Sequence, residues 1–291
     1  MTPIREAANG PMSVRAGIGL RFAHHRAIVD ERPAVGWLEV HAENYFGGGT
    51  ALAWLDAIRR DYPIALHGVG ASLGSVDAID DRHLARLQRL IERVEPIFVS
   101  EHLAWNAVDG VYLADLLPLP MTEEALAVVC RNVERMQARL GTRILVENPS
   151  TYLRFVDSTI PEAQFLSALV AKTGCALLCD VNNAYVSAAN HGLDAYAWLA
   201  GLPASSVREI HIAGHATRHV DGCELRIDDH GSPVSGDVWQ LYGHALERFG
   251  PIPTLVEWDT RVPPLDTLVA QAQHADVALA AASGDRNVRS A

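Results

Sequence analysis

Histidines and carboxylates gather in the stretch from residue 207 to residue 230 of this 291-residue chain. His211 lies at the centre of a short apolar run, His215 follows it, and Asp228 and His230 form an Asp-x-His pair. Neutral imidazoles and carboxylates are the ligands that borderline and hard divalent metals use, and no thiol is needed among them. Because alternate residues of an extended segment point the same way, Asp228 and His230 can reach one ion. The stretch therefore predicts half of a metal site, with the other ligands supplied by other segments.

The elements that would position these groups alternate regularly along the chain. Short and almost entirely apolar segments are predicted as eight strands, at residues 16–22, 36–41, 63–67, 96–102, 143–147, 175–181, 207–213 and 253–258. Segments with apolar residues at helical spacing lie between them, one ending near residue 32 and the others at 50–62, 80–95, 122–140, 161–172, 193–199, 237–249 and 264–282. Continuous apolar strands are typical of a parallel sheet covered on both faces.

Eight strand–helix units in one chain predict an α/β fold, a single (β/α)8 TIM barrel. A doubly wound open sheet is the alternative, but the first strand–helix turn lacks the G-x-G-x-x-G phosphate loop. We expect a loose N-terminal lead-in at residues 1–14, the catalytic barrel at 15–282, and a flexible C-terminal tail at 283–291. Residues 47–49 and 104–121 are expected to be loops.

Metal-ligating side chains fall at or near the ends of six successive predicted strands, namely His67, His102, Glu147, Asp180, His211 and Glu257. In a barrel those ends face one mouth, where active sites are built. Burying so many carboxylates and imidazoles together without a cation is costly. These six residues with Asp228 and His230 are therefore predicted to hold two or three metal ions, with Glu147 bridging. A hydrogen-bonded polar mouth without metal is the alternative, and the ligand types leave iron, manganese and zinc open.

Further polar residues lie close to the predicted ligands in the sequence. We expect them to orient ligands through hydrogen bonds or to contact the substrate, and they are His24, His41, Asn44, Asn148, Asn182 and His215. Asn183 is a further candidate for orienting a ligand, and His215 is equally a candidate for an additional ligand.

Composition limits the classes of partner. The formal net charge is −11, from 24 basic and 35 acidic residues, which argues against a primary nucleic-acid binder. Apolar runs are too short to span a membrane, and the N-terminus lacks the apolar segment of an export signal. The four cysteines show no paired pattern, which favours reduced, buried thiols over disulfides. We therefore expect a soluble cytoplasmic protein.

The ordered strand-end motifs resemble one known family. They are GIGLRFAHH, EVHAENYF, LHGVGASLG, SEHLAW, LVENPSTY, CDVNNAYV, HIAGH, the Asp-x-His pair and VEWD, from residue 17 to residue 259. In this order they resemble the multinuclear non-haem iron-dependent oxidative enzymes, a family of xylose-isomerase-like barrels. The resemblance implies two or three irons at the mouth, held by His67, His102, Glu147, Asp180, His211, Asp228, His230 and Glu257.

The resemblance also implies an activity and partners. Members of the family use O₂ to modify cysteine or nearby residues oxidatively in ribosomally made precursor peptides, usually with a partner protein that recognises the peptide leader. Two other functions stay open. One is a zinc or manganese barrel like sugar isomerases or endonuclease-type phosphoesterases. The other is a non-catalytic scaffold that binds a peptide or a partner, which an incomplete ligand set would indicate.

Overall fold

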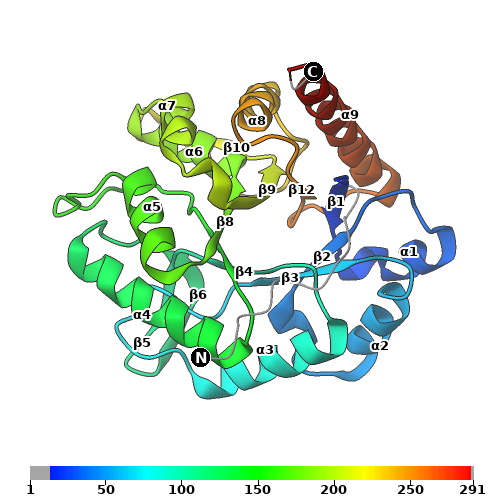
Figure 1. Ribbon diagram of the computed structural model, residues 1–291, viewed down its shortest axis with the longest axis horizontal. Coiled ribbons are helices and arrows are strands. Elements are labelled where there is room, and N and C mark those ends of the chain that lie inside the picture. Colours follow the sequence, from blue (N-terminus) through cyan, green and yellow to red (C-terminus); the bar gives the residue numbers. More distant parts are fainter. Residues whose placement is uncertain (1–13, 290–291) are drawn as a thin grey trace.

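A closed barrel of eight parallel strands forms the centre of the computed structural model, which describes residues 14–289, with side chains as far as residue 284 (Figure 1). Around the barrel the order is β1, β12, β9, β8, β7, β4, β3, β2. The strands are β1 (Ala16–Gly19), β2 (Leu38–His41), β3 (Ile64–Gly68), β4 (Val99–His102), β7 (Leu145–Glu147), β8 (Ala176–Asp180), β9 (Val207–Ala213) and β12 (Thr254–Glu257). Because all eight are parallel, their carboxyl ends open on one rim, and the (β/α)8 prediction is confirmed.

Helices cover the outside of the barrel (Figure 1). They are α1 (His25–Glu31), α2 (Gly49–Ile58), α3 (Asp81–Val94), α4 (Glu123–Leu140), α5 (Glu162–Thr173), α6 (Val181–His191), α7 (Ala195–Gly201), α8 (Gly236–Phe249) and α9 (Leu265–Arg289), with 3-10 turns η1 (Phe22–His24), η2 (Ala42–Tyr45) and η3 (Ala204–Ser206). Local signals set their ends: Thr122 caps α4 by accepting from the Ala125 amide, and Gly141 ends it at φ 66°.

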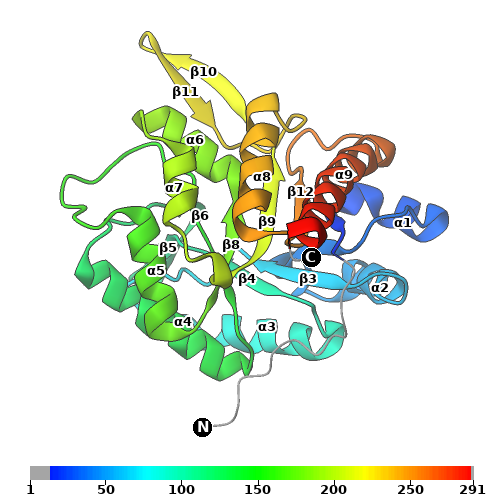
Figure 2. The ribbon, with the colours of Figure 1, turned by 45° about the horizontal axis from the view of Figure 1, so that its top comes forward.

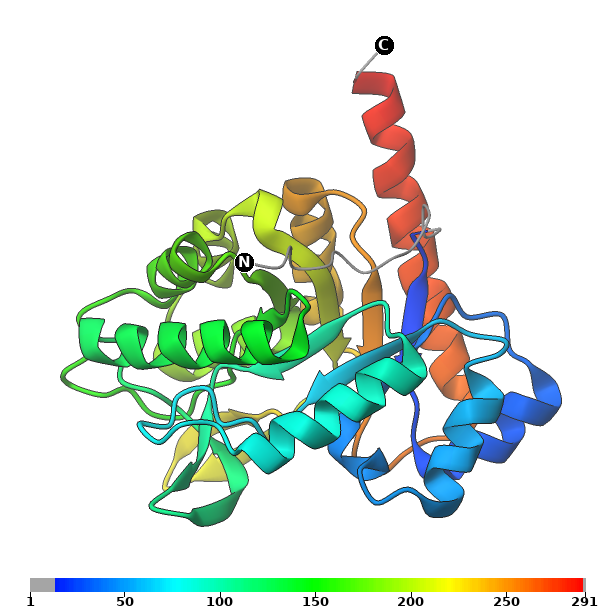
Figure 3. The same cartoon turned by 60° about the horizontal axis from the view of Figure 1, so that its bottom comes forward.

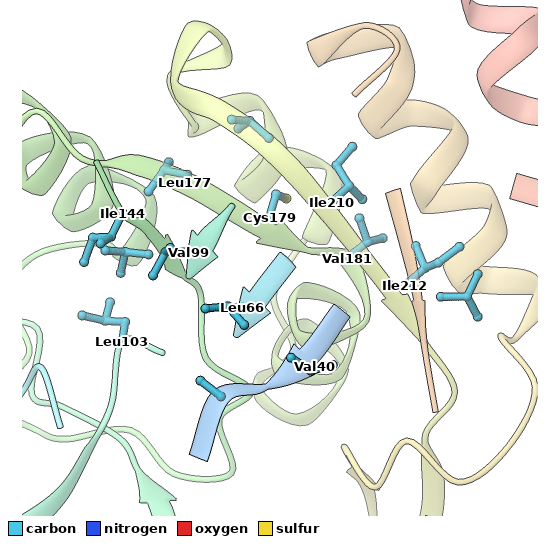
Figure 4. Close-up of a cluster of buried hydrophobic side chains, with 14 of the residues drawn as sticks. Val40, Leu66, Val99, Leu103, Ile144, Leu177, Cys179, Val181, Ile210 and Ile212 are labelled. Atoms are coloured by element: carbon cyan, nitrogen blue, oxygen red, sulfur yellow. The ribbon is translucent and has the colours of Figure 1, made fainter. Parts of the chain in front are cut away.

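The hydrophobic core lies between the strands and the helices, and apolar side chains from neighbouring strands converge there (Figure 4). Ile210 and Ile212 of β9 are both fully buried in it. Because side chains alternate along a strand, Glu209 and His211 point to the opposite side, into the barrel. Burying one such isoleucine stabilises the fold by about 1.5–3 kcal/mol. The buried apolar side chains of each strand therefore fix the positions of the polar side chains that alternate with them.

Two hairpins were not predicted, one in the expected loop at 104–121 and the other between His215 and Asp228. β5 (Trp105–Val108) pairs with β6 (Val111–Leu117), and β10 (Ala216–Val220) pairs with β11 (Cys223–Ile227). The second hairpin projects from the barrel (Figure 2). Each turn is an Asp-Gly pair with positive φ at both residues, Asp109-Gly110 and Asp221-Gly222. Such pairs are a strong hairpin signal, so both hairpins were detectable.

Helix α6 follows β8 directly, and no helix was predicted at this position. Asp180 caps it by accepting from the Asn183 amide at 2.6 Å, and Gly192 ends it at φ 66°. The strand and the helix therefore share Asp180, which places its carboxylate at the rim.

The chain ends differ in part from the prediction. α9 continues to Arg289, beyond the predicted end at 282, so most of the predicted flexible tail at 283–291 is helical, and this part extends past the barrel (Figure 3). The predicted lead-in at 1–14 lies almost wholly outside the described residues. The expected glycine loop at 47–49 is a turn that leads into α2.

The cysteines are free, as expected, but not all are buried. Cys130, Cys175 and Cys179 are buried, whereas Cys223 on β11 is exposed, which corrects the prediction. No helix within residues 14–289 has the length and apolar character that crossing a membrane requires.

Candidate metal centre

Three predicted ligands meet at the ends of adjacent strands β3, β4 and β7. Glu147 Oε2 lies 3.2 Å from His67 Nε2 and 3.3 Å from His102 Nε2. The two Nε2 atoms are themselves 3.3 Å apart. His67 and Glu147 are almost fully buried. The three atoms thus form a small, nearly equilateral triangle, which is the arrangement of ligands on one face of a metal ion.

Hydrogen bonds on the far side of each ring fix these imidazoles. His102 Nδ1 lies 3.0 Å from the Gly68 carbonyl oxygen, which can only accept, so Nδ1 carries a proton. His67 Nδ1 lies 2.7 Å from Ser100 Oγ. Both rings therefore direct Nε2 at Glu147, and such outer contacts are typical of metal-bound histidines.

Glu147 also belongs to a second group with Asp180 and His211, in which the potential ligand atoms lie within 4.8 Å of one another. β8 and β9 pair so that Asp180 is opposite His211. Glu147 therefore stands between two sets of ligands, as the predicted bridging role requires.

The remaining predicted ligands continue the chain of contacts from His211. Glu257 Oε2 lies 3.2 Å from His211 Nδ1 and 3.5 Å from His230 Nδ1. His230 Nε2 lies 2.7 Å from Asp228 Oδ1. The pair does converge, but φ of His230 is +43°, so the segment is not a regular extended strand and the reason given from the sequence was wrong. The structure thus brings all eight predicted residues together, and the incomplete set that would favour a scaffold is not observed.

Burial and charge act against each other in this centre. Burial lowers the pKa of His67, but its hydrogen bond with Glu147 and the charge of that carboxylate outweigh burial and raise the pKa to about 10. Burial raises the pKa of Glu147, but the charges of His102 and His67 outweigh it and lower that pKa to about 2. Burial and the Glu147 charge raise the pKa of Asp180 well above its usual range. Positive charge close to the buried carboxylates therefore stabilises them. Either protonated imidazoles or metal ions supply that charge.

Several buried ligand atoms have no well-formed hydrogen bond to any described residue. They are Glu147 Oε2, Asp180 Oδ2, both ring nitrogens of His211, and His230 Nε2. A buried polar atom left unpaired costs about 1–3 kcal/mol. Metal ions would satisfy the carboxylate oxygens, His230 Nε2 and one ring nitrogen of His211, whose other nitrogen carries a proton. These donors are the imidazoles and carboxylates that iron, manganese and zinc accept. The residues therefore fit a multinuclear metal site.

Three of the six supporting residues predicted from the sequence contact the centre directly. His41 Nε2 lies 3.5 Å from Glu257 Oε1. Asn182 Nδ2 donates to Asp228 Oδ1 at 2.6 Å. Asn148 joins β7 to β8, because it exchanges hydrogen bonds of 2.9 Å with the Asp180 backbone. These three contacts agree with an orienting role.

The other three lie further out. His215 Nδ1 lies 2.9 Å from Asn182 Oδ1 and so supports a residue that contacts Asp228. His24 is buried against the Pro263 carbonyl oxygen at 2.8 Å. Asn44 is exposed on η2.

Sequence reasoning missed four charged residues around the centre. Glu39 and Glu209 are buried in the barrel, 3.3 and 3.5 Å from His211 Nε2. Arg21 pairs with both Glu257 and Asp259, and Asp259 lies 3.2 Å from His230 Nδ1. Strand alternation was the available signal, because Glu39 and Glu209 are each two residues before a residue of the centre, His41 or His211.

Asn183 provides a test of how the ligands are oriented. Its Nδ2 donates to Glu147 Oε1 at 3.1 Å and to the Asn148 carbonyl at 3.0 Å. We expect Asn183→Ala to weaken metal binding roughly 10- to 100-fold, because the loss of an outer hydrogen bond frees the Glu147 carboxylate. Competition with a chelator measures this. The control is Asn132→Ala, since Asn132 is also buried and donates to two carbonyls, but in α4; equal metal affinity in the two variants would contradict the role of Asn183.

Comparisons with known proteins agree with this geometry. Residues 15–280 match the model of a family described as "RiPP precursor modification enzyme MbnB/TglH/ChrH". A UPF0276 protein of Acaryochloris marina is 48% identical over 264 residues, which cover 91% of this chain and 94% of the relative. A UPF0276 protein of Caulobacter vibrioides is 49% identical over 257 residues, covering 88% and 90%.

Solved structures show the same architecture at low sequence identity. D-psicose 3-epimerase from Clostridium cellulolyticum H10 superimposes with a TM-score of 0.59 at 11% identity, covering 92% of this chain and 98% of that one. A xylose isomerase domain protein from Planctomyces limnophilus gives 0.57 at 15% identity, covering 94% and 97%. These two likenesses concern the fold alone, which is that of a xylose-isomerase-like barrel. The match over residues 15–280, together with relatives nearly half identical along almost their whole length, shows that the chain belongs to the MbnB/TglH/ChrH family of RiPP precursor modification enzymes.

Proposed function

We propose that this enzyme holds two or three iron ions and uses O₂ to modify cysteine residues of its precursor peptide oxidatively. The observation that carries the proposal is the position of Glu147, whose carboxylate is buried between two imidazoles on one side and Asp180 and His211 on the other. A carboxylate shared in this way is suited to bridge two ions. We further propose that the protein acts in the cytoplasm, where its free cysteines stay reduced.

The ligands divide by their contacts. His67, His102 and Glu147 would hold one ion, and Glu147, Asp180 and His211 would hold a second. A third ion would lie among Asp228, His230 and Glu257. Bound iron supplies sites for a thiolate and for O₂, and the electrons that oxidative chemistry requires.

The residues of the chain fix the geometry of this reaction. Asn183 and Asn148 hold the rim of β7 against β8, and Arg21 neutralises part of the charge of Glu257. Rigid, buried ligands keep the reacting groups at fixed positions, which is how a protein lowers the entropic part of a barrier.

Exposed apolar side chains near the rim support a peptide substrate. Val111 and Tyr112 of the β5–β6 hairpin are 57% and 60% exposed, and Leu153 and Val156 after β7 are 52% and 100% exposed. Both segments follow the carboxyl ends of strands that carry ligands. Exposed apolar residues grouped around a site commonly mark a binding surface. We propose that the core peptide lies here and that a separate partner protein recognises its leader.

Oxygen consumption with a defined peptide tests the proposed function. Protein purified without oxygen is expected to contain two to three equivalents of iron, as measured by elemental analysis. A cysteine-containing precursor peptide encoded beside the gene, supplied with the leader-recognising partner encoded there, should cause O₂ uptake and a mass change in the peptide. The same peptide with serine in place of cysteine is the control and should cause neither.

Two results would contradict parts of this proposed function. Abundant zinc or manganese without iron, combined with no O₂ uptake, would favour a Lewis-acid enzyme acting as an isomerase or a phosphoesterase. Neighbouring reading frames that encode no such peptide would weaken the choice of substrate.

A further inference from the structure

A second cluster of potential ligands lies outside the centre, on the wall of a cavity of about 680 Å³. The cavity is bounded by η2, by the loop that follows β3, by the start of α3 and by the β5–β6 hairpin. Figure 3 shows α3 and this hairpin on the same side of the barrel. Glu43 and His83 line the cavity, and Glu101 lies behind them.

The three side chains are close enough to share one ion. Each offers a ligand atom, and these atoms lie within 4.8 Å of one another. His83 Nε2 is 3.5 Å from Glu43 Oε1. Glu101 is only 1% exposed. One imidazole with two carboxylates is a donor set that borderline divalent cations accept.

Two of the potential ligand atoms lack a well-formed hydrogen bond, although His83 Nε2 has Glu43 Oε1 at 3.5 Å. Glu43 Oε2 and His83 Nε2 are both inaccessible to solvent and have no hydrogen-bond partner among the described residues. Each unpaired buried atom costs about 1–3 kcal/mol, and two neighbouring carboxylates add repulsion. A cation between them would remove both costs.

Backbone contacts hold the two carboxylates in position before any ion binds. Glu43 Oε1 accepts from the Val69 amide at 3.1 Å, and Glu101 Oε2 accepts from the Ala71 amide at 3.0 Å. Gly70 lies between these amides, and a Cβ there would be 3.0 Å from His83 Cε1 and 3.1 Å from Glu43 Oε1. The absence of a side chain at Gly70 therefore leaves room for the cluster.

We infer that Glu43, His83 and Glu101 bind a single divalent cation of the zinc, manganese or ferrous class, in addition to the ions of the main centre. The two sites share no ligand. They are neighbours, because Glu101 Oε1 accepts from the His102 amide at 3.0 Å and lies 3.8 Å from His102 Nδ1. Three protein ligands leave one or more positions open toward the cavity, where water or a group of a bound molecule completes the coordination.

Zinc binding to the iron-loaded protein tests this inference, with the zinc and iron of each sample counted after equilibrium dialysis. The wild-type chain is expected to bind one more zinc ion than His83→Ala, and Glu43→Gln should weaken that ion roughly 10- to 100-fold. Arg86→Ala is the matched control, because Arg86 lines the same cavity on the same helix but is no ligand. It should bind zinc as the wild type does.

Iron content separates this inference from the proposed function. His83→Ala should keep the iron of the main centre, and Glu147→Ala should lose that iron while retaining the extra zinc. Anomalous scattering at the zinc edge should place the ion between Glu43 and His83. Zinc bound by His83→Ala and Glu43→Gln with wild-type stoichiometry and affinity would overturn the inference, whatever metal the main centre holds.

Discussion

Glu147→Ala is expected to reduce bound iron to near zero while the helices stay intact. Glu147 Oε2 contacts both His67 and His102 at 3.2–3.3 Å, and the same side chain belongs to the group with Asp180 and His211. One substitution therefore removes a ligand from two ions. The substitution also removes a negative charge that attracts the cations, which weakens binding further. Elemental analysis together with far-ultraviolet circular dichroism measures both outcomes.

Glu147→Gln separates the charge of Glu147 from its volume. Glutamine keeps the size of the side chain and a hydrogen bond to Asn183, but it is neutral and a poor bridging ligand. We expect this variant to fold at least as well as wild type without metal and still to lack most of its iron. Retained iron in both variants, with normal circular dichroism, would show that Glu147 does not bridge.

The sequence was sufficient for the barrel because its strands are buried on both faces. Short apolar runs such as those ending at His67 and Glu147 are typical of parallel strands buried on both faces, and the amphipathic segments between them have the pattern of helices that cover such a sheet. The site followed from the same fact, since polar residues at the ends of parallel strands share a rim. Asp180 and His211, 31 residues apart in the sequence, lie opposite each other in the register of β8 and β9.

The sequence was insufficient where function overrides local preference. α6 was missed because Asp180 was assigned to a strand end alone, although it is also the cap of the next helix. The path that returns Asp228 and His230 to the rim depends on the β10–β11 hairpin, whose Asp-Gly turn was overlooked, and on the left-handed backbone of His230. Glu39 and Glu209 were missed because they lie inside the predicted strands 36–41 and 207–213, whereas candidates were sought at strand ends. Strand alternation and the Asp-Gly turn were local signals for some of these features, but the contacts that bring them to the centre form only across the folded barrel.

Gly214→Ala is expected to lose the part of the centre that Asp228 and His230 form. Gly214 follows β9, and a Cβ there would overlap the carbonyl oxygen of Ser232, two residues beyond His230. The Ser232 backbone cannot move aside as the end of a flexible side chain can. The whole segment that carries His230 must therefore move away from Glu257. Overpacking of this kind costs about 1–3 kcal/mol of stability, and we expect a roughly 10- to 100-fold loss of affinity for the ion nearest His230.

Gly243→Ala is the matched control, because both changes add one methyl group to a glycine without a positive φ. Gly243 lies in α8, and beyond its chain neighbours and the backbone of its own helix a Cβ there would have no described atom within 4 Å. Alanine in a helix is favoured over glycine, so this variant should gain about 0.5–1 kcal/mol of stability and keep its iron. Comparing metal content and thermal unfolding in the two variants separates displacement of the Ser232 segment from any general effect of the substitution. If Gly214→Ala kept full iron content and activity, the contact between β9 and this segment would not be what positions His230.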